Sequence, residues 1–135
     1  MPSIFTRIIA GELPARWVWK DDRAVAFLTV EPLAYGHALV VPRAEIESWL
    51  DLDAATAAHL HTVAQTVGKA ILRAFKPRRV GYTLIGLEVP HTHIHLVPLN
   101  KGSDLVFANA MKSPDATKMD EAAEAIRREL RAVRA

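Results

Sequence analysis

The chain has 135 residues, of which 50% are hydrophobic and 24% charged, and this composition predicts a single globular domain spanning residues 1–135. A formal net charge of only +2 and the absence of a long basic run exclude duplex nucleic acid as an expected partner. The lack of cysteine excludes disulfides and thiolate chemistry, and the lack of a long apolar run or secretory signal predicts a cytoplasmic protein without membrane association.

The N-terminal part of the chain predicts a short helix followed by three strands. Hydrophobic residues recur at helical spacing over 4–9 and stop before Gly11, which is typical of a helix end. Two apolar segments, 16–20 and 24–28, flank a polar turn and predict a β-hairpin. A loop containing proline and glycine then leads to a third strand over 37–41.

The rest of the chain predicts a long helix, two further strands and a closing helix. Apolar residues keep helical spacing from the N-cap residue Asp53 to residue 75. Strands are predicted over 80–85 and 91–97, and a C-terminal helix over about 113–134. Five strands joined mostly by short turns, with one long helix before the last two, indicate an α+β fold in which helices cover a five-stranded antiparallel sheet.

Three of the six histidines occupy alternate positions in the last predicted strand: His91, His93 and His95. Successive side chains of a strand point to opposite faces, so these rings are expected to share one face while the intervening residues face the core. Neighbouring rings start about 6.6 Å apart, which is twice the rise per residue. The shared face must be solvated, hydrogen-bonded or occupied by a ligand, because buried polar groups need partners.

Three interpretations fit this pattern: the rings are structural and hydrogen-bonded, they bind zinc or copper, or they are catalytic. A shared metal ion would require a bent strand, because the outer rings begin about 13 Å apart on a straight one. In the catalytic interpretation the middle ring, His93, attacks phosphorus as a neutral nucleophile. A protonated neighbour then stabilises charge on the phosphoryl oxygens, and we favour this interpretation because it uses the spacing directly.

Residues 91–97 resemble the His-x-His-x-His-x-x signature, with apolar x, of the histidine triad (HIT) family. Segments 3–15 and 36–42 also resemble the family in order and spacing, so the resemblance covers residues 3–98 and leaves a C-terminal extension. The resemblance implies a HIT-like fold and homodimers in which two sheets join edge to edge. No cofactor is expected.

The resemblance also implies a hydrolase or transferase that cleaves nucleoside 5′-monophosphate conjugates, such as phosphoramidates or dinucleoside polyphosphates. The reaction would pass through a covalent nucleotidyl-His93 intermediate. His95 and His91 would flank the phosphate and orient the nucleophile, and His37 would join them as a proton partner. Two alternatives stay open: a nucleotide-binding regulatory protein with weak or no catalysis, and a histidine-rich metal-binding protein.

The same resemblance places nucleotide-binding side chains on the first helix, around the second and third strands and in the turn before the triad. They are Ile4, Phe5, Ile8, Phe27, Thr29, Val30, Leu39, Glu88 and Val89. Thr29 stands where relatives usually carry an acidic residue for the ribose hydroxyls, and threonine lacks the charge for that contact. Ser3 and Thr6 stand where many bacterial relatives have zinc-binding cysteines, so we expect folding without metal. His59 and His61 are expected to be solvated on the long helix.

Overall fold

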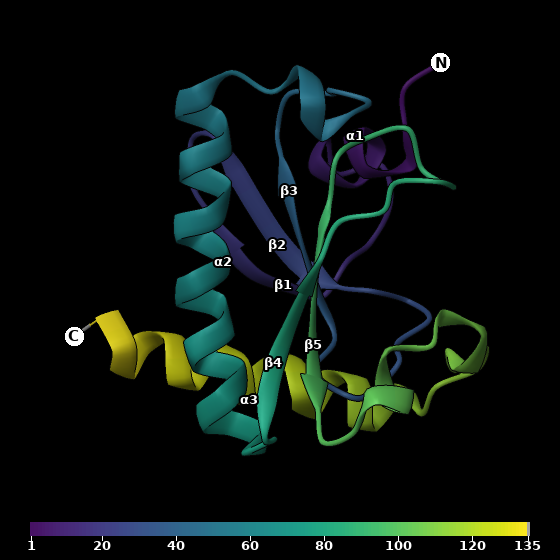
Figure 1. Cartoon of the computed structure of the whole chain (residues 1–135), viewed down its shortest axis with the longest axis vertical. Helices are drawn as coiled ribbons and strands as arrows, with labels where there is room; N and C mark the ends of the chain where they lie inside the picture. Colours follow the sequence, from purple (N-terminus) through teal and green to yellow (C-terminus); the bar gives the residue numbers. More distant parts are fainter. Residues whose placement is uncertain (135) are drawn as a thin grey trace.

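The computed structural model describes residues 1–134, which form a five-stranded antiparallel sheet with helices on both of its faces (Figure 1). The strands are β1 (Trp17–Lys20), β2 (Ala24–Leu28), β3 (Ala38–Pro42), β4 (Arg79–Thr83) and β5 (Ile94–Leu99). The helices are α1 (Ile4–Ile9), α2 (Ala54–Phe75) and α3 (Ala116–Arg134), with short 3-10 turns η1 (Trp49–Asp51), η2 (Gly102–Leu105) and η3 (Phe107–Asn109). The predicted α+β fold is confirmed.

The order of the strands in the sheet is β1-β2-β3-β5-β4, and every neighbouring pair is antiparallel. The long helix α2 carries the chain from β3 to the edge strand β4, and β5 then returns into the space between β3 and β4. The last strand is therefore an interior strand of the sheet. In this register His95 lies directly opposite Leu39 of β3.

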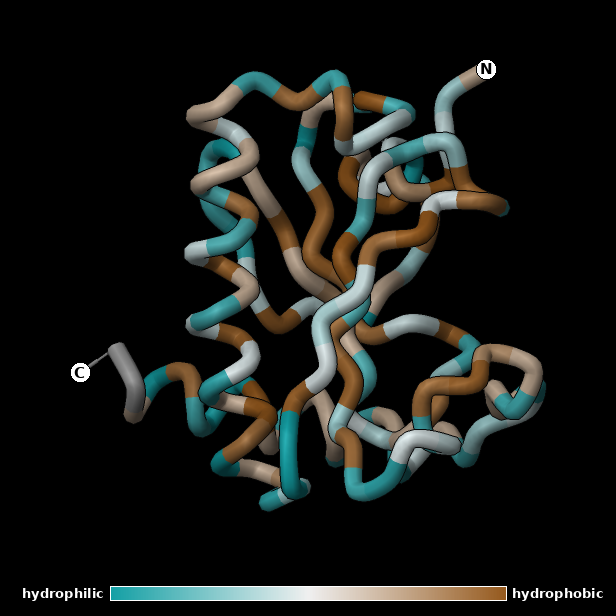
Figure 2. Tube along the Cα trace, viewed as in Figure 1, coloured by the Kyte–Doolittle hydropathy of each residue, from teal (hydrophilic) through white to brown (hydrophobic). Residues whose placement is uncertain are grey.

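Both faces of the sheet are buried, and each face belongs to a different hydrophobic cluster. Alternate residues such as Ala26, Val40 and Ile94 pack against α2 and α3, while Phe27 and Leu39 pack against α1 on the other face. Figure 2 shows the resulting pattern, with hydrophobic strand residues gathered between hydrophilic outer surfaces. Because strand side chains alternate, the residues of β5 that flank His95 face α2, and His95 itself faces the α1 side.

The long helices begin and end where the sequence predicts. The side chain of Asp53 caps α2 by accepting a hydrogen bond from the backbone N–H of Thr56 at 2.7 Å, and Lys76 ends the helix in the left-handed conformation. Asp115 caps α3 in the same way, through the backbone N–H of Lys118 at 2.9 Å. Among residues 1–134, no helix combines the length and the hydrophobicity needed to cross a bilayer.

The prediction that the last strand begins at His91 is wrong, because β5 begins at Ile94. Residues 91–93 do not join the sheet, since their backbone groups bond elsewhere. The N–H of His91 donates to the carbonyl of Val89 at 2.8 Å, and the N–H of Thr92 donates to the carbonyl of Ile46 at 2.7 Å. The chain therefore bends at the histidines before it enters the sheet.

Candidate active site

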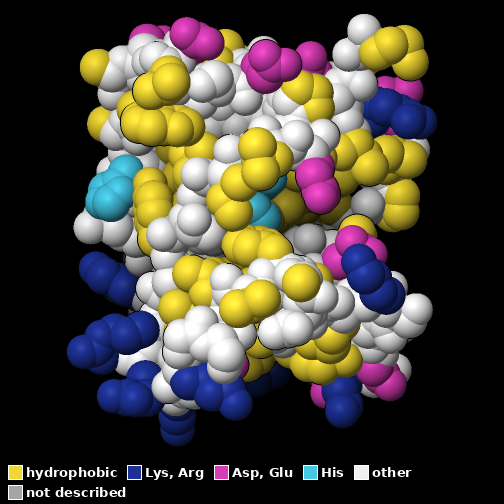
Figure 3. All heavy atoms as spheres, turned by 45° about the vertical axis from the view of Figure 1, so that its right-hand side comes forward, with side chains coloured by type: hydrophobic (Ala, Val, Ile, Leu, Met, Phe, Trp, Pro, Cys, Tyr) yellow, Lys and Arg dark blue, Asp and Glu magenta, His cyan; other side chains and the backbone are white. Residues whose placement is uncertain are grey.

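A cavity of about 710 Å³ opens on the α1 side of the sheet, and three histidines contribute to its wall: His37, His93 and His95. Figure 3 shows histidine atoms at the bottom of a hollow that is framed by hydrophobic side chains. The volume lies within the range of pockets that bind small molecules and cofactors, roughly 300–1,000 Å³. The cavity thus presents polar groups inside an otherwise apolar wall.

His91 is buried completely, and the structure places it behind the cavity rather than on its wall. Its Nε2 lies 2.7 Å from the carbonyl oxygen of Pro42, which can only accept, so Nε2 carries the proton. Its Nδ1 lies 2.7 Å from Ser3 Oγ and therefore accepts the hydroxyl proton. Both ring nitrogens of His91 are thus occupied by protein atoms in this structure. Its predicted role beside the phosphate stays a prediction.

His93 has one bound nitrogen and one open nitrogen. Its Nδ1 lies 2.8 Å from the carbonyl oxygen of His91, so Nδ1 carries the proton and donates it. Among residues 1–134, Nε2 has no hydrogen-bond partner, and the ring lines the cavity. Burial lowers the pKa of His93 from its usual value, which keeps the ring neutral near pH 7. The ring therefore offers an unshared electron pair to the cavity, as a nucleophile must.

His95 offers the opposite group, a free N–H. The backbone N–H of Leu33 donates to Nδ1 of His37 at 3.0 Å, so the proton of neutral His37 is on Nε2. That Nε2–H donates to Nδ1 of His95 at 2.9 Å, which leaves the proton of neutral His95 on Nε2. Among the described residues this Nε2–H has no partner, and the ring lines the cavity.

The electrostatic environment keeps these two rings neutral. Burial, followed by the proximity of His95 and His93, lowers the pKa of His37 to about 3. Burial, followed by the proximity of His93, lowers the pKa of His95 to about 4. Both rings are therefore expected to be neutral near pH 7, and a protonated neighbour beside a bound phosphate stays a prediction. A neutral ring still donates through Nε2–H, so charge stabilisation by a hydrogen bond remains available.

The loop that delivers His37 depends on Gly36. This residue has a φ of 104°, a left-handed conformation that side chains rarely adopt. A Cβ atom at this position would also lie 2.5 Å from the ring of Phe75 at the end of α2. Only glycine fits, so the sequence at this point serves to bring His37 into contact with His95.

The rings of His93 and His95 lie 4.9 Å apart between centroids, in an edge-to-face arrangement. This is closer than the straight-strand estimate, because His93 lies in the bend before β5. Phe5 of α1 packs edge-to-face on His93 at 4.9 Å and on His91 at 5.8 Å, so all three triad rings lie on the α1 side. Among residues 1–134, no group of three histidine or acidic side chains is arranged to hold a metal ion.

The structure places all nine predicted nucleotide-binding residues on the cavity wall: Ile4, Phe5, Ile8, Phe27, Thr29, Val30, Leu39, Glu88 and Val89. Their role in binding stays a prediction. Sequence reasoning missed the contribution of the C-terminal part, from which Phe107, Ala110, Lys112 and Asp120 also line the cavity. One signal was present, because Phe107 is the only phenylalanine, tyrosine or tryptophan after Tyr82.

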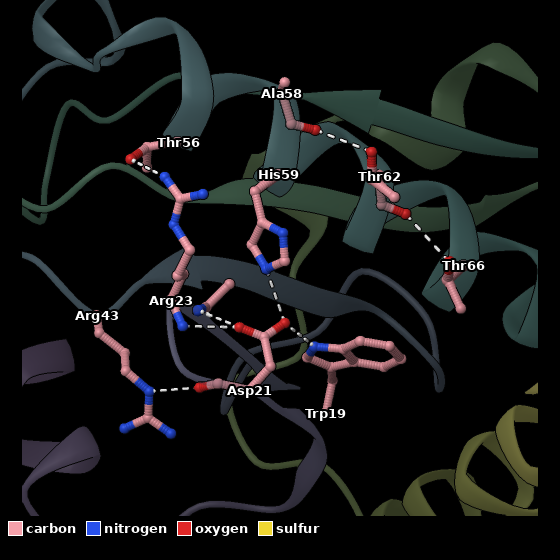
Figure 4. Close-up of polar contacts among 10 residues, drawn as sticks. Trp19, Asp21, Arg23, Arg43, Thr56, Ala58, His59, Thr62 and Thr66 are labelled. Atoms are coloured by element: carbon pink, nitrogen blue, oxygen red, sulfur yellow. Dashed lines mark hydrogen bonds and ion pairs between the residues drawn. The ribbon is translucent and has the colours of Figure 1, made fainter.

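A second polar cluster with a histidine lies outside the cavity wall, at the turn between β1 and β2 (Figure 4). Asp21 accepts hydrogen bonds from Nε1 of Trp19 and Nε2 of His59, at 2.7 and 2.8 Å. It also accepts from the backbone N–H groups of Arg23 and Ala24, both at 2.8 Å. His59 is thus partly buried and bonded to the turn, rather than solvated as predicted.

Comparison with known proteins identifies a family that this chain matches. The family model described as the HIT domain matches residues 10–102. An uncharacterized HIT-like protein of Borreliella burgdorferi is 34% identical over 116 residues, which cover 81% of this chain and 84% of the relative. An adenylylsulfatase of Arabidopsis thaliana is 26% identical over 125 residues, which cover 89% of this chain and 63% of the relative.

The fold is also similar to that of a solved structure, a hypothetical histidine triad nucleotide-binding protein from Sulfolobus tokodaii. The two structures superpose with a TM-score of 0.83 at 26% identity, and the match covers 96% of this chain and 93% of the other. The family model ends at residue 102, so the residues of the C-terminal part that line the cavity lie outside the matched region.

Proposed function

We propose that this chain, which belongs to the HIT domain family, is an enzyme that cleaves nucleoside 5′-monophosphate conjugates through a covalent bond to His93. One observation carries the proposal: the unshared pair on Nε2 of His93 and the free Nε2–H of His95 face the same cavity. A nucleophile beside a hydrogen-bond donor is the arrangement that displacement at phosphorus requires. We take nucleotides as the substrate class because the chain belongs to the HIT family.

In the first step the electron pair on Nε2 of His93 forms a bond to phosphorus. The bond from phosphorus to the leaving atom breaks, and its electron pair stays with the leaving atom, which accepts a hydrogen bond from Nε2–H of His95. The phosphorylated ring carries a positive charge, which the carbonyl of His91 stabilises through Nδ1–H. A basic leaving group takes its proton from solvent.

In the second step a water oxygen bonds to phosphorus, and the phosphorus–nitrogen bond breaks. The electron pair of that bond returns to Nε2 of His93, and the water releases one proton to solvent. The products are the nucleoside 5′-monophosphate and the free enzyme. Another hydroxyl or phosphate acceptor in place of water would make the same reaction a nucleotidyl transfer.

The apolar wall of the cavity suits the base and sugar of a nucleotide. Phe5 and Phe27 lie edge to face with their centroids 5.6 Å apart, and Ile8 and Leu39 belong to the same hydrophobic cluster. Base faces and alkyl side chains exclude water from such a wall, which adds affinity without fixing the identity of the base. Thr29 supplies one hydroxyl to the ribose in place of a carboxylate.

Adenylyl sulfate is one substrate to test, because a relative is named an adenylylsulfatase. Its leaving group, sulfate, departs as a stable anion and makes little demand on His95. Phosphoramidates and dinucleoside polyphosphates, which the family resemblance implies, have more basic leaving groups and demand more. A panel of these three classes therefore covers the range of leaving groups that the geometry admits.

A homodimer is the expected assembly. β4 is an edge strand, and an exposed edge presents unpaired backbone groups that can pair with another strand. Tyr82 of β4 is 48% exposed, so the edge strand itself carries exposed aromatic surface. Light scattering should give twice the chain mass, and Tyr82→Arg should shift it toward the monomer. A monomeric wild-type protein would contradict this assembly.

Intact-mass trapping tests the proposed reaction. The protein is mixed with each conjugate and quenched in alkaline denaturant within milliseconds to seconds, because the phosphorus–nitrogen bond of the adduct breaks in acid. A mass increase of one nucleoside monophosphate, mapped to His93, is expected for the wild type and for the control His59→Ala, and not for His93→Ala. Nucleotide binding without adduct or product across the whole panel would contradict the enzyme and favour a nucleotide-binding regulatory protein.

A further inference from the structure

The connection between β5 and α3, residues 100–115, lies against His37 and His95 and contributes residues that the family model does not cover. In Figure 1 it projects from the end of β5 as the two short turns η2 and η3. Phe107, Ala110 and Lys112 of this connection line the cavity. Part of the cavity wall therefore comes from residues that lie outside the match to the family model.

Phe107 contacts both members of the hydrogen-bonded histidine pair. Its ring centroid lies 4.8 Å from that of His95, with an interplanar angle of 69°, and 6.2 Å from that of His37, with an angle of 66°. Both contacts are edge-type, the arrangement that aromatic rings prefer. The ring of His95 has a hydrogen bond at Nδ1 only. The orientation of the ring therefore depends on packing as well as on this bond.

The connection is itself anchored to the loop that fixes the proton of His37. The backbone N–H of Met111 donates to the carbonyl of Pro32 at 2.9 Å, and the N–H of Asp115 donates to the hydroxyl of Tyr35 at 3.0 Å. Leu33, whose N–H holds Nδ1 of His37, lies between these two anchor points in the sequence. Phe107 and the His37 loop are thus held as one unit.

We propose that Phe107 is a positioning residue that holds the His95 ring with Nε2–H directed at the leaving atom. This inference rests on the proposed function, because a directed donor matters only if a leaving group departs beside it. Phe107 does not touch the reacting atoms in this account, and it acts through His95. The ring also keeps water from competing for the bond between His37 and His95.

The test compares two aryl esters of adenosine 5′-monophosphate, the phenyl ester and the p-nitrophenyl ester. Phenolate is the more basic leaving group and carries more charge in the transition state, so it depends more on the donor. In Phe107→Ala, kcat is expected to fall about tenfold for the phenyl ester and about twofold for the p-nitrophenyl ester, with KM changed less than kcat.

Two variants serve as controls. Phe107→Tyr keeps the aromatic ring and should recover most of the phenyl ester rate. Val106→Ala removes a neighbouring side chain of the same connection, which is 44% exposed, and should leave both rates unchanged. An equal loss for both esters in Phe107→Ala, or no recovery in Phe107→Tyr, would overturn the proposal.

A second readout does not depend on turnover. Because burial is the main cause of the low pKa of His95, Phe107→Ala should raise that pKa, measured by NMR titration of the ring, whereas Val106→Ala should not. An unchanged His95 pKa in Phe107→Ala overturns the positioning role whatever the rates. If neither ester nor any other conjugate is turned over, the proposed function fails, and this titration alone decides the contact of Phe107 with His95.

Discussion

Two polar clusters with histidines lie in this molecule, and their hydrogen bonds differ in kind. At the β1–β2 turn, both carboxylate oxygens of Asp21 accept bonds, from His59, Trp19 and two backbone groups. Around the cavity, both ring nitrogens of His37 and of His91 have hydrogen-bond partners. One ring nitrogen of His93 and one of His95 have no partner among residues 1–134. The carboxylate at the centre of the first cluster is saturated, whereas two rings of the second cluster each keep an open nitrogen in a cavity.

The difference shows how to separate a structural histidine from a functional one. A fixed ring with an open nitrogen costs free energy unless something binds there, because polar groups lose water in a half-closed site. Two cavity rings carry this cost: His93 has an electron pair and His95 a proton directed at the same space without a partner. We infer that open ring nitrogens on a cavity wall, rather than the count of histidines, distinguish the site.

The largest expected effect is the loss of activity in His93→Ala. Removing the nucleophile should lower the rate of turnover by about 10³-fold or more, because the neighbouring ring of His95 presents a proton rather than an electron pair to the cavity. The matched change in the saturated cluster, His59→Ala, should alter the rate less than about twofold. Steady-state kinetics on any conjugate that the wild type cleaves checks both, and comparable losses in the two variants would erase the distinction.

A smaller effect, on stability, should appear at the saturated cluster. Asp21→Ala leaves the indole N–H, the His59 N–H and two backbone groups without their acceptor, which should lower the free energy of unfolding by about 2 kcal/mol. Activity per folded molecule should not change. Urea unfolding measures the first quantity and kcat the second, and a loss of kcat without a loss of stability would show that the turn affects the cavity.

The smallest effect separates the clusters by pH. The folded pKa values of His37 and His95, about 3 and about 4, lie below the usual value of 6.5, so the unfolded chain binds protons first and stability falls as the pH drops below about 6.5. At Asp21 burial would raise the pKa, but its hydrogen bonds outweigh burial and lower it to about 2. That contribution is lost only below the usual value of 3.8.

Unfolding curves at a series of pH values should therefore show two ranges. His37→Ala should flatten the dependence between pH 6.5 and about 4, by at least about 1 kcal/mol, while Asp21→Asn should flatten it only below about pH 4. If His37→Ala left the dependence between pH 6.5 and about 4 unchanged, the cavity histidines would be charged in the folded protein.

The sequence predicts much of this fold because its signals are local. Asp53 and the pair Lys76 and Pro77 mark the ends of α2. Continuous runs of apolar residues mark β2 and β3, which are buried on both faces. The spacing of the histidines predicts a site, and the family resemblance predicts its wall. These features need only the neighbours of each residue along the chain.

The features that the sequence does not predict depend on contacts between distant segments. His91 turns away from the cavity because Pro42 and Ser3 occupy its nitrogens, and the backbone of Thr92 bonds to Ile46 instead of to a strand. No periodicity reports such pairings. Phe107 reaches His95 for the same reason, since its position follows from the anchoring of residues 100–115 to the loop before His37.

The most direct test of the account is the protonation of the histidine rings in the free protein at pH 7. Long-range ¹H–¹⁵N NMR of histidine-labelled protein reports which nitrogen of each ring carries the proton. The account predicts the Nδ1–H form for His93 and the Nε2–H form for His37, His91 and His95, all neutral. A charged His93, or a His93 with its proton on Nε2, would remove the electron pair from the cavity and contradict the account.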